Sequence, residues 1–297
     1  MRRCPPELHG EALLLLARRN AADDVAAPSP ALQQHDAARF PLDGLLIAEG
    51  ADRLVGAAYF SIQPGRMALV WPPVVDECAD GQRVGDALLD EICRRVDECG
   101  CKLAQCLLEP ASPDGCSMER HGFARLTELL YAERLLEEPL PPCLPNELRW
   151  IAYDREAAHA RFAALLEATY AGTFDCPELN GLRSADESLA GHGASGRFDP
   201  RLWRLYETAG SDAGLILLAD HPGARAWEVV YMGVVPPMRG RGVGREMLAR
   251  ALHDARAAGC EAVLLAVDVR NRSARRLYEQ LGFVELCRRV IHVRLGR

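Results

Sequence analysis

The sequence of 297 residues has little lysine, few aromatic side chains and no long apolar run. Lys102 is the single lysine among 35 basic residues, and aromatic residues make up 6% of the chain. Because no basic stripe with interleaved aromatic residues occurs, the arginine content indicates coding bias and not nucleic-acid binding. The apolar stretch at residues 12–17 is too short for a signal core or for crossing a bilayer. We therefore expect a cytoplasmic protein that binds neither nucleic acid nor a membrane.

Paired cysteines are also missing, although the chain contains 11 cysteines. No C-x-x-C pair occurs, and Cys99 and Cys101, the two closest, have no second pair or histidine at zinc spacing. Neither a disulfide scaffold nor a metal site is indicated. We expect a reduced intracellular chain in which cysteine serves as a small apolar side chain.

Length and charge divide the chain into two parts. With 49% apolar residues, 297 residues suffice for two globular domains. Residues 1–146 carry 14 basic and 23 acidic residues, a balance of −9, whereas residues 147–297 carry 21 and 19, a balance of +2. The second part is therefore the one expected to bind an anion.

A proline-rich segment separates the two parts. Four prolines lie within residues 137–145, and proline neither continues a helix nor fits inside a sheet. We expect a first domain at residues 1–138, a linker at 139–146 and a second domain at 147–297. The domains are copies of one unit, because an offset of 159 residues places Gly81, Val84, Gly85, Leu89, Gly100 and Cys101 on Gly240, Val243, Gly244, Leu248, Gly259 and Cys260.

The apolar periodicity predicts an α/β fold with a mixed sheet in each copy. Apolar residues recur at helical spacing from Val84 and from Val243, and each predicted helix is followed by a glycine and a short apolar run. In the second copy we expect strands at residues 148–153, 215–219, 227–235, 262–267 and 284–295, and helices at 155–170, 199–207, 243–258 and 273–280.

The string R-G-R-G-V-G at residues 239–244 joins an expected strand to an expected helix. A glycine-rich turn that opens a helix presents free backbone N–H groups and the positive end of the helix dipole, which together bind anions. Glycine lets a phosphate approach the backbone, and arginine adds planar donors. Taken alone, the string fits a surface turn equally well. A dinucleotide-binding fold is disfavoured because other elements precede the strand and because no acidic residue about 20 positions later stands at the end of a strand. A Walker site is excluded because Gly-Lys-Ser/Thr is missing.

Two spaced segments make the second copy resemble the GNAT N-acetyltransferases. In that superfamily (Q/R)-x-x-G-x-(G/A) binds the pyrophosphate of acetyl-CoA, and Asn-x-x-Ala-x-x-x-Tyr-x-x-x-Gly-Phe forms the helix beside the pantetheine. The first pattern covers Arg239, Gly240, Arg241, Gly242, Val243 and Gly244, and the second covers Asn271, Ala274, Tyr278, Gly282 and Phe283. The resemblance extends over residues 147–297 and, in degraded form, over residues 7–136.

The resemblance implies a set of site residues. Glu228, eleven positions before Arg239, takes the place of the general base, and Tyr278 that of the general acid. The backbone of Val234 and Val235 is expected to bind the pantetheine arm and polarise the thioester carbonyl, with Asn271 and Ala274 beside it. The reaction implied is direct attack of a primary amine on acetyl-CoA in a ternary complex, without a covalent enzyme intermediate and without a metal.

The first copy lacks this set. At the offset of 159, Asp80 replaces Arg239 and Leu69 replaces Glu228, and at an offset of 160, which aligns Gly122 with Gly282, Met118 replaces Tyr278. We therefore expect a degenerate first domain and one active site per chain.

The acceptor is not defined by these motifs. The segment at residues 170–183 is expected to line the acceptor cleft, where Asp175 and Glu178 either hold an amine cation or merely solvate a connection. The tandem arrangement also resembles mycothiol synthase, which acetylates a cysteinyl pseudodisaccharide, and this remains an alternative acceptor. A non-enzymatic acetyl-CoA sensor is a further alternative, disfavoured because a sensor needs neither Glu228 nor Tyr278. Either a monomer or a homodimer is compatible with the sequence.

Overall fold

The computed structural model describes residues 1–22, 41–51, 53–76, 80–143 and 148–296, which form two compact units. The described part of the first unit comprises residues 1–22, 41–127 and 289–296, and the second comprises residues 128–288. Among these residues, no helix is both long enough and apolar enough to cross a membrane.

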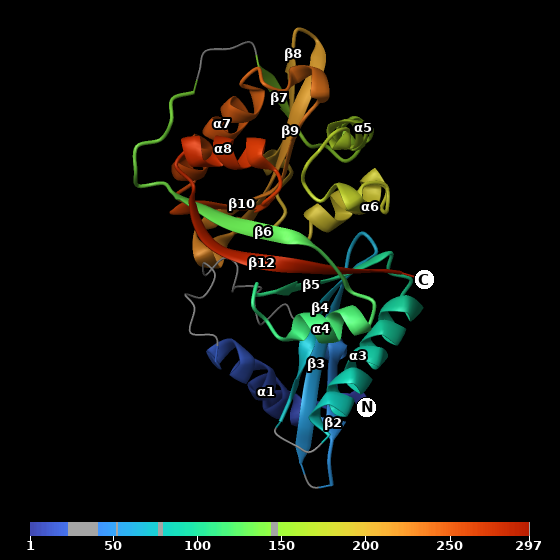
Figure 1. The fold of residues 1–297 in the computed structure, drawn as a ribbon. Helices are drawn as coiled ribbons and strands as arrows, with labels where there is room; N and C mark the ends of the chain where they lie inside the picture. Colours follow the sequence, from blue (N-terminus) through green and yellow to red (C-terminus); the bar gives the residue numbers. More distant parts are fainter. Residues whose placement is uncertain (23–40, 52, 77–79, 144–147, 297) are drawn as a thin grey trace. The chain divides into compact units, whose positions relative to one another are not determined.

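The first unit is a mixed sheet with helices on its faces (Figure 1). Its sheet order is β1-β2-β3-β4-β5-β12, and β4 pairs with β5 in parallel. Helix α3 buries one apolar stripe, formed by Leu88, Leu89, Ile92 and Val96, as its periodicity predicts. The elements are β1 (Arg2–Arg3), α1 (His9–Ala22), β2 (Leu45–Glu49), β3 (Leu54–Gln63), β4 (Met67–Val75), α3 (Gly81–Glu98), β5 (Leu103–Leu108), α4 (Asp114–Arg120) and the end of β12 (Val284–Leu295).

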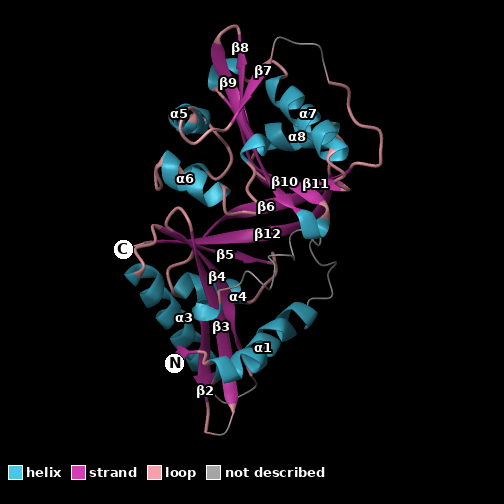
Figure 2. Ribbon diagram, turned by 180° about the vertical axis from the view of Figure 1, so that it is seen from behind, coloured by secondary structure: helices cyan, strands magenta, loops and turns pink. Residues whose placement is uncertain are grey.

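The second unit has the same plan, with sheet order β6-β11-β10-β9-β8-β7. Helices α7 and α8 cover one face, where Met247 and Leu252 are fully buried, and α5 and α6 cover the other, where Phe162 and Leu166 are (Figure 2). The elements are β6 (Ala124–Leu135), β7 (Arg149–Ala152), α5 (His159–Tyr170), α6 (Ala185–His192), β8 (Trp203–Thr208), β9 (Ser211–His221), β10 (Ala226–Val234), α7 (Val243–Ala257), β11 (Ala262–Asp268) and α8 (Arg272–Gln280).

The last strands of the two copies are exchanged between the units. Strands β6 and β12 occupy equivalent places in the repeat, yet β6 pairs with β11 of the second copy, and β12 pairs with β5 of the first. The registers are equivalent as well, because Leu135 lies opposite Ala262 as Leu295 lies opposite Leu103. The compact units therefore do not follow the boundary expected at residues 139–146: residues 128–138 group with the second unit and 289–296 with the first.

The expected α/β class and the repeat are confirmed, with one wrong element. Residues 199–207, expected to be a helix, form a 3₁₀ turn at Pro200–Leu202 and then strand β8. Asp199 caps only this turn, and the residues that follow, of which Trp203 to Tyr206 are all buried, pair with β9. Helix α6 was not expected. Its start carries a capping box in which Ser184 and Glu187 each bond the other's backbone N–H, and this signal is readable in the sequence.

Candidate active site

Strands β10 and β11 separate partway along their length. They pair in parallel only from Ala226 to Val229 of β10. Beyond a bulge between Val229 and Tyr231, β10 stays paired with β9 as far as Val234, and β11 stays paired with β6 as far as Asp268. The second half of β10 therefore has a free edge that faces the diverging end of β11, and an extended ligand can pair with such an edge.

The backbone groups at this edge follow from strand alternation. Val235 donates its N–H to Ala213 on the β9 side at 3.0 Å. Because successive N–H groups of a strand point to opposite sides, those of Val234 and Met232 face the free edge. Of the two expected backbone contacts, Val234 is thus available and the Val235 N–H is occupied. Met232 was missed by the sequence analysis, since only the pairing register reveals it.

The glycine turn opens helix α7 as expected. Gly240 and Gly242 have φ values of 73° and 80°, in the left-handed region that favours glycine. The first helical N–H with a partner is that of Glu246, which donates to the carbonyl of Gly242 at 3.0 Å. The N–H groups of Val243, Gly244 and Arg245 precede it and have no acceptor one turn earlier, so the turn has the geometry of an anion site.

The Arg239 side chain is held by the protein itself. Its guanidinium donates three hydrogen bonds to backbone carbonyls: Nε to Val234 at 3.0 Å, Nη1 to Gly172 at 3.1 Å and Nη2 to Thr169 at 2.9 Å. Three of its five N–H donors are therefore used within the protein, and Arg239 ties the turn to the end of α5. Arg241, two residues on, is exposed.

Tyr278 lies buried on α8, with its ring 5.8 Å from that of Phe283. Burial, and then the negative charge of Asp175, raise the pKa of its hydroxyl well above the usual range. The hydroxyl is therefore protonated at neutral pH, as a proton donor must be. At the start of the same helix, Asn271 accepts the N–H of Ala274 at 3.2 Å, so it is seen here in the capping role.

Glu228 lies on β10 between Ala219 of β9 and Leu264 of β11. Its side chain is 23% exposed, and Oε2 lies 2.9 Å from Nε2 of His221. Trp227 and Val229, its neighbours in sequence, belong to the core beneath α7. By strand alternation Glu228 faces the opposite side of the sheet, which is the side of α5 and α6. The structure thus places Glu228 and the α7 turn at different ends of the same strand.

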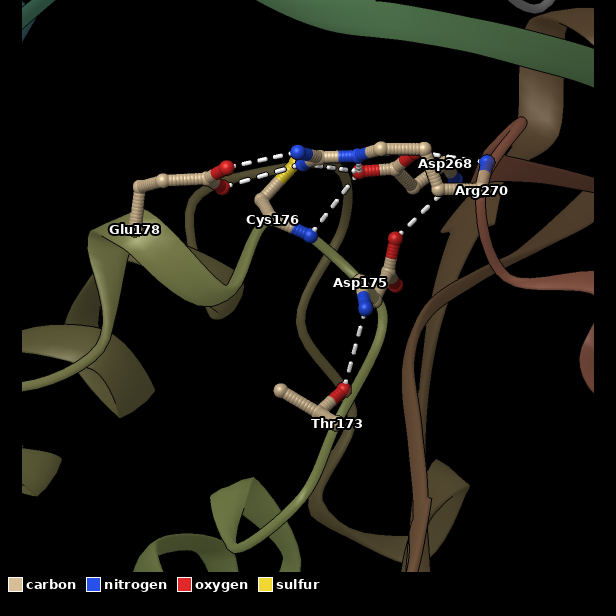
Figure 3. A network of polar contacts seen from close by, with 6 residues as sticks. All are labelled: Thr173, Asp175, Cys176, Glu178, Asp268 and Arg270. Carbon is tan, nitrogen blue, oxygen red and sulfur yellow. Dashed lines mark hydrogen bonds and ion pairs between the residues drawn. The ribbon is translucent and has the colours of Figure 1, made fainter.

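The loop between α5 and α6 is tied to the ends of both diverging strands, and Figure 3 shows the contacts on the β11 side. On the β10 side, Arg239 bonds the carbonyls of Thr169 and Gly172. On the β11 side, the fully buried Asp268 accepts the N–H of Cys176 at 3.1 Å and donates its own N–H to Asp175 at 3.0 Å. The loop therefore spans the opening between the strands.

Side chains of this loop and of the end of β11 form one group of the residue types that bind metals. Asp175, Cys176 and Asp268 each offer an atom, and these atoms lie within 4.8 Å of one another. The donor set does not fit a metal. Asp268 already accepts bonds from Arg270 through Nε and Nη2, and burial raises the pKa of the Cys176 thiol so that the thiolate is disfavoured. The ten cysteines among the described residues are all free.

Comparison with known proteins identifies the class. The sequence profile of the acetyltransferase (GNAT) family matches residues 129–283. The chain belongs to this family. The match includes β6, so it follows the second compact unit and begins before the expected boundary.

Individual relatives extend this result. The chain is 33% identical over 168 residues to the mycothiol acetyltransferase of Thermobispora bispora, which is 54% of this chain and 55% of that one. It is 29% identical over 294 residues to the mycothiol acetyltransferase of Rhodococcus jostii, with 91% and 89% covered. The chain thus spans little more than half the length of the relative that it matches at the higher identity. A GCN5-related N-acetyltransferase from Sphaerobacter thermophilus has the same fold, with a TM-score of 0.69, 21% identity, and 100% and 96% coverage.

Proposed function

We propose that the chain transfers an acetyl group from acetyl-CoA to a primary amine, at one site in the second unit. The observation that supports the proposal is the split of β10 from β11, because the free edge of β10 leads into the glycine turn that opens α7, and Tyr278 belongs to the same core cluster as Val243 of this turn. In this proposal the pyrophosphate binds the N–H groups of Val243 and Gly244, with Gly240, Gly242 and the side chain of Arg241 around it. The pantetheine arm lies along the edge of β10 beside Asn271 and Ala274.

The chemistry then needs two proton transfers. The amine loses a proton to Glu228, directly or through water, and attacks the thioester carbonyl, whose oxygen is stabilised by N–H groups of the β10 edge. The carbon–sulfur bond breaks as Tyr278 donates its proton to the departing thiolate. The close His221 keeps the Glu228 carboxylate oriented. In this scheme the acetyl carbon bonds only to the acceptor nitrogen, and no side chain of the protein forms a covalent bond with it.

The proposal also covers the acceptor, the cellular location, the oligomeric state and the role of the first unit. A cysteinyl pseudodisaccharide is the second candidate acceptor, favoured by the similarity to mycothiol acetyltransferases. We place the enzyme in the cytoplasm, as a monomer or homodimer without a metal and without nucleic-acid partners. We also propose that the first unit is catalytically degenerate, because Asp80 stands at the start of α3 and pairs there with Arg83 at 2.8 Å.

An acceptor screen with CoA release as the readout tests the activity. It includes simple amines, amino acids, aminoglycosides, peptides and the cysteinyl pseudodisaccharide. With the best acceptor, Glu228→Gln should leave acetyl-CoA affinity intact while turnover falls by roughly 10²-fold. Glu279→Gln is the control, since it removes the same charge from an exposed site beside Tyr278. If none of the amines in the screen causes release of CoA, the enzymatic proposal fails and the sensor alternative is favoured. Unchanged turnover in Glu228→Gln removes Glu228 as the base.

A further inference from the structure

The loop between α5 and α6 contains two carboxylates whose surroundings differ. Glu178 forms a two-pronged ion pair with Arg270, at 2.5 and 2.9 Å. Asp175 accepts only the backbone N–H of Asp268, through Oδ1. Among the described residues, no other hydrogen bond or ion pair to the Asp175 carboxylate is found, and its second oxygen points away from Asp268 in Figure 3. Glu178 is therefore neutralised, and Asp175 is not.

The nearby guanidinium of Arg270 does not pair with the charge of Asp175. Arg270 bonds Asp268 through Nε and Nη2 and Glu178 through Nη1 and Nη2. One positive charge thus faces three carboxylates, of which the two that it contacts are Asp268 and Glu178. Asp175 is left with the surplus negative charge, and a cationic ligand would compensate it.

The location of Asp175 points to the acyl-transfer site. Its loop spans the opening between β10 and β11 and is tied to the end of each strand. Asp175 is exposed to solvent, and desolvation of its carboxyl, partly offset by the hydrogen bond from the N–H of Asp268, raises its pKa. Its carboxylate is bonded at 3.0 Å to the last residue of β11, the strand that leads into α8 with Tyr278. Its negative charge contributes to the raised pKa of the Tyr278 hydroxyl.

We propose that Asp175 binds the positively charged amino group of the acceptor through its free oxygen and holds it beside Tyr278. This inference rests on the proposed acetyl transfer and narrows its substrates to compact amines that bind as ammonium ions. A hydrogen bond from an ammonium to a carboxylate fixes the nitrogen in position. The nitrogen then gives up one proton to Glu228 and attacks as the neutral amine. As the carbon–sulfur bond breaks, the nitrogen loses its second proton, which replaces the one that Tyr278 has given to the thiolate. The exposed Phe174, next in the chain, offers an apolar contact for the carbon skeleton of the acceptor.

Two nearly isosteric probes separate charge recognition from structure. Benzylamine is an ammonium ion at pH 7, whereas phenylhydrazine, in which NH replaces the CH₂, is mostly neutral. We expect Asp175→Asn to raise the KM for benzylamine at least about tenfold and to leave that for phenylhydrazine within about twofold. Acetyl-CoA affinity, measured by calorimetry, should not change. Glu178→Gln is the matched control: it loosens the loop by releasing Arg270, so it should affect both probes alike.

The outcomes are distinct. An equal effect of Asp175→Asn on both probes, or an effect only on acetyl-CoA affinity, overturns the proposal, because the side chain then acts on the loop or the thioester. A wild-type chain that acetylates neither these probes nor any amine of the screen contradicts the proposed function itself, and the role of Asp175 falls with it. A wild-type chain that acetylates phenylhydrazine and prefers it to benzylamine contradicts the Asp175 proposal alone.

Discussion

The guanidinium of Arg239 donates a hydrogen bond to the carbonyl of Thr169, at the end of α5, over 2.9 Å. The same side chain bonds the carbonyls of Gly172 and Val234, so three acceptors lose their partner if it is removed. We expect Arg239→Gln to lower the free energy of unfolding by about 1–3 kcal/mol and to raise the KM for the acceptor, because the loop that carries Asp175 loses its tie to β10. Chemical denaturation and steady-state kinetics measure the two effects.

Arg241 provides the control for this prediction. It is exposed in the same turn, and in our proposal it contacts the pyrophosphate. Arg241→Gln should leave the free energy of unfolding unchanged and weaken acetyl-CoA binding about three- to tenfold, in a salt-dependent manner. If instead Arg239→Gln weakened acetyl-CoA binding without destabilising the fold, the assignment of the two arginines would have to be reversed.

The hydroxyl of Tyr278 is the second target. Since burial and Asp175 raise its pKa, the hydroxyl remains protonated over the whole working pH range. We expect Tyr278→Phe to reduce kcat by about 10²-fold with little change in acetyl-CoA affinity, because only protonation of the leaving thiolate is lost. A thioester analogue with a more acidic thiol should recover much of the rate. Equal losses with both thioesters would show that the ring merely packs against Phe283.

His192 makes the stability of the second unit depend on pH. It ends helix α6, its ring lies 5.4 Å from that of Tyr231, and burial, followed by the charge of Arg183, lowers its pKa from 6.5 to about 4. The unfolded chain therefore binds a proton at a higher pH than the folded chain does. The stabilisation is complete above pH 6.5 and is lost as the pH falls towards 4, with an upper limit of about 3 kcal/mol.

Denaturation curves at several pH values test this prediction. Their slope in the window between 6.5 and 4 should be smaller in His192→Gln than in the wild type, because glutamine does not titrate. Identical slopes in wild type and His192→Gln would contradict the prediction.

Local sequence signals predicted the fold where they acted within one copy. The stripe from Val243 and the glycine turn placed α7 within one residue, and the apolar run at residues 262–267 placed β11. The helix expected at residues 199–207 failed because Asp-Pro starts a 3₁₀ turn as readily as a helix, and pairing with β9 then decides. The exchange of β6 and β12 could not be read from the sequence, because either strand can pair in the same register with β5 or with β11.

The site was predictable for backbone motifs and less so for side chains. The conformation of the glycine turn follows from the local spacing of Gly240 and Gly242. Two of the three carbonyls that hold Arg239 come from a distant segment of the sequence. Arg270 is also distant from Glu178, and its pairing with Glu178 leaves Asp175 as the open carboxylate. Which of several charged side chains finds a partner depends on tertiary contacts that no local pattern records.

The equivalence of β6 and β12 leads to a prediction about a fragment of residues 147–297. This fragment lacks β6, so the edge of β11 is left without its seven paired residues. Strand β12 occupies the equivalent place in the repeat, and we expect it to pair with β11 instead, as in a reversed domain swap. Amides of residues 289–295 should then be protected from hydrogen exchange in the isolated fragment.

The loss of stability caused by pairing β12 with β11 should come from residue 292. His292 would take the place of Ala132, which is buried in the core of the second unit, and the larger ring would overpack it. Arg294 would take the place of Arg134, and the two are chemically equal. His292→Ala should therefore stabilise the fragment by about 1–3 kcal/mol in thermal or chemical unfolding. In the full chain it should destabilise, because His292 is itself buried beside β5. If the fragment aggregated, or if His292→Ala did not stabilise it, the equivalence of the two strands would be contradicted.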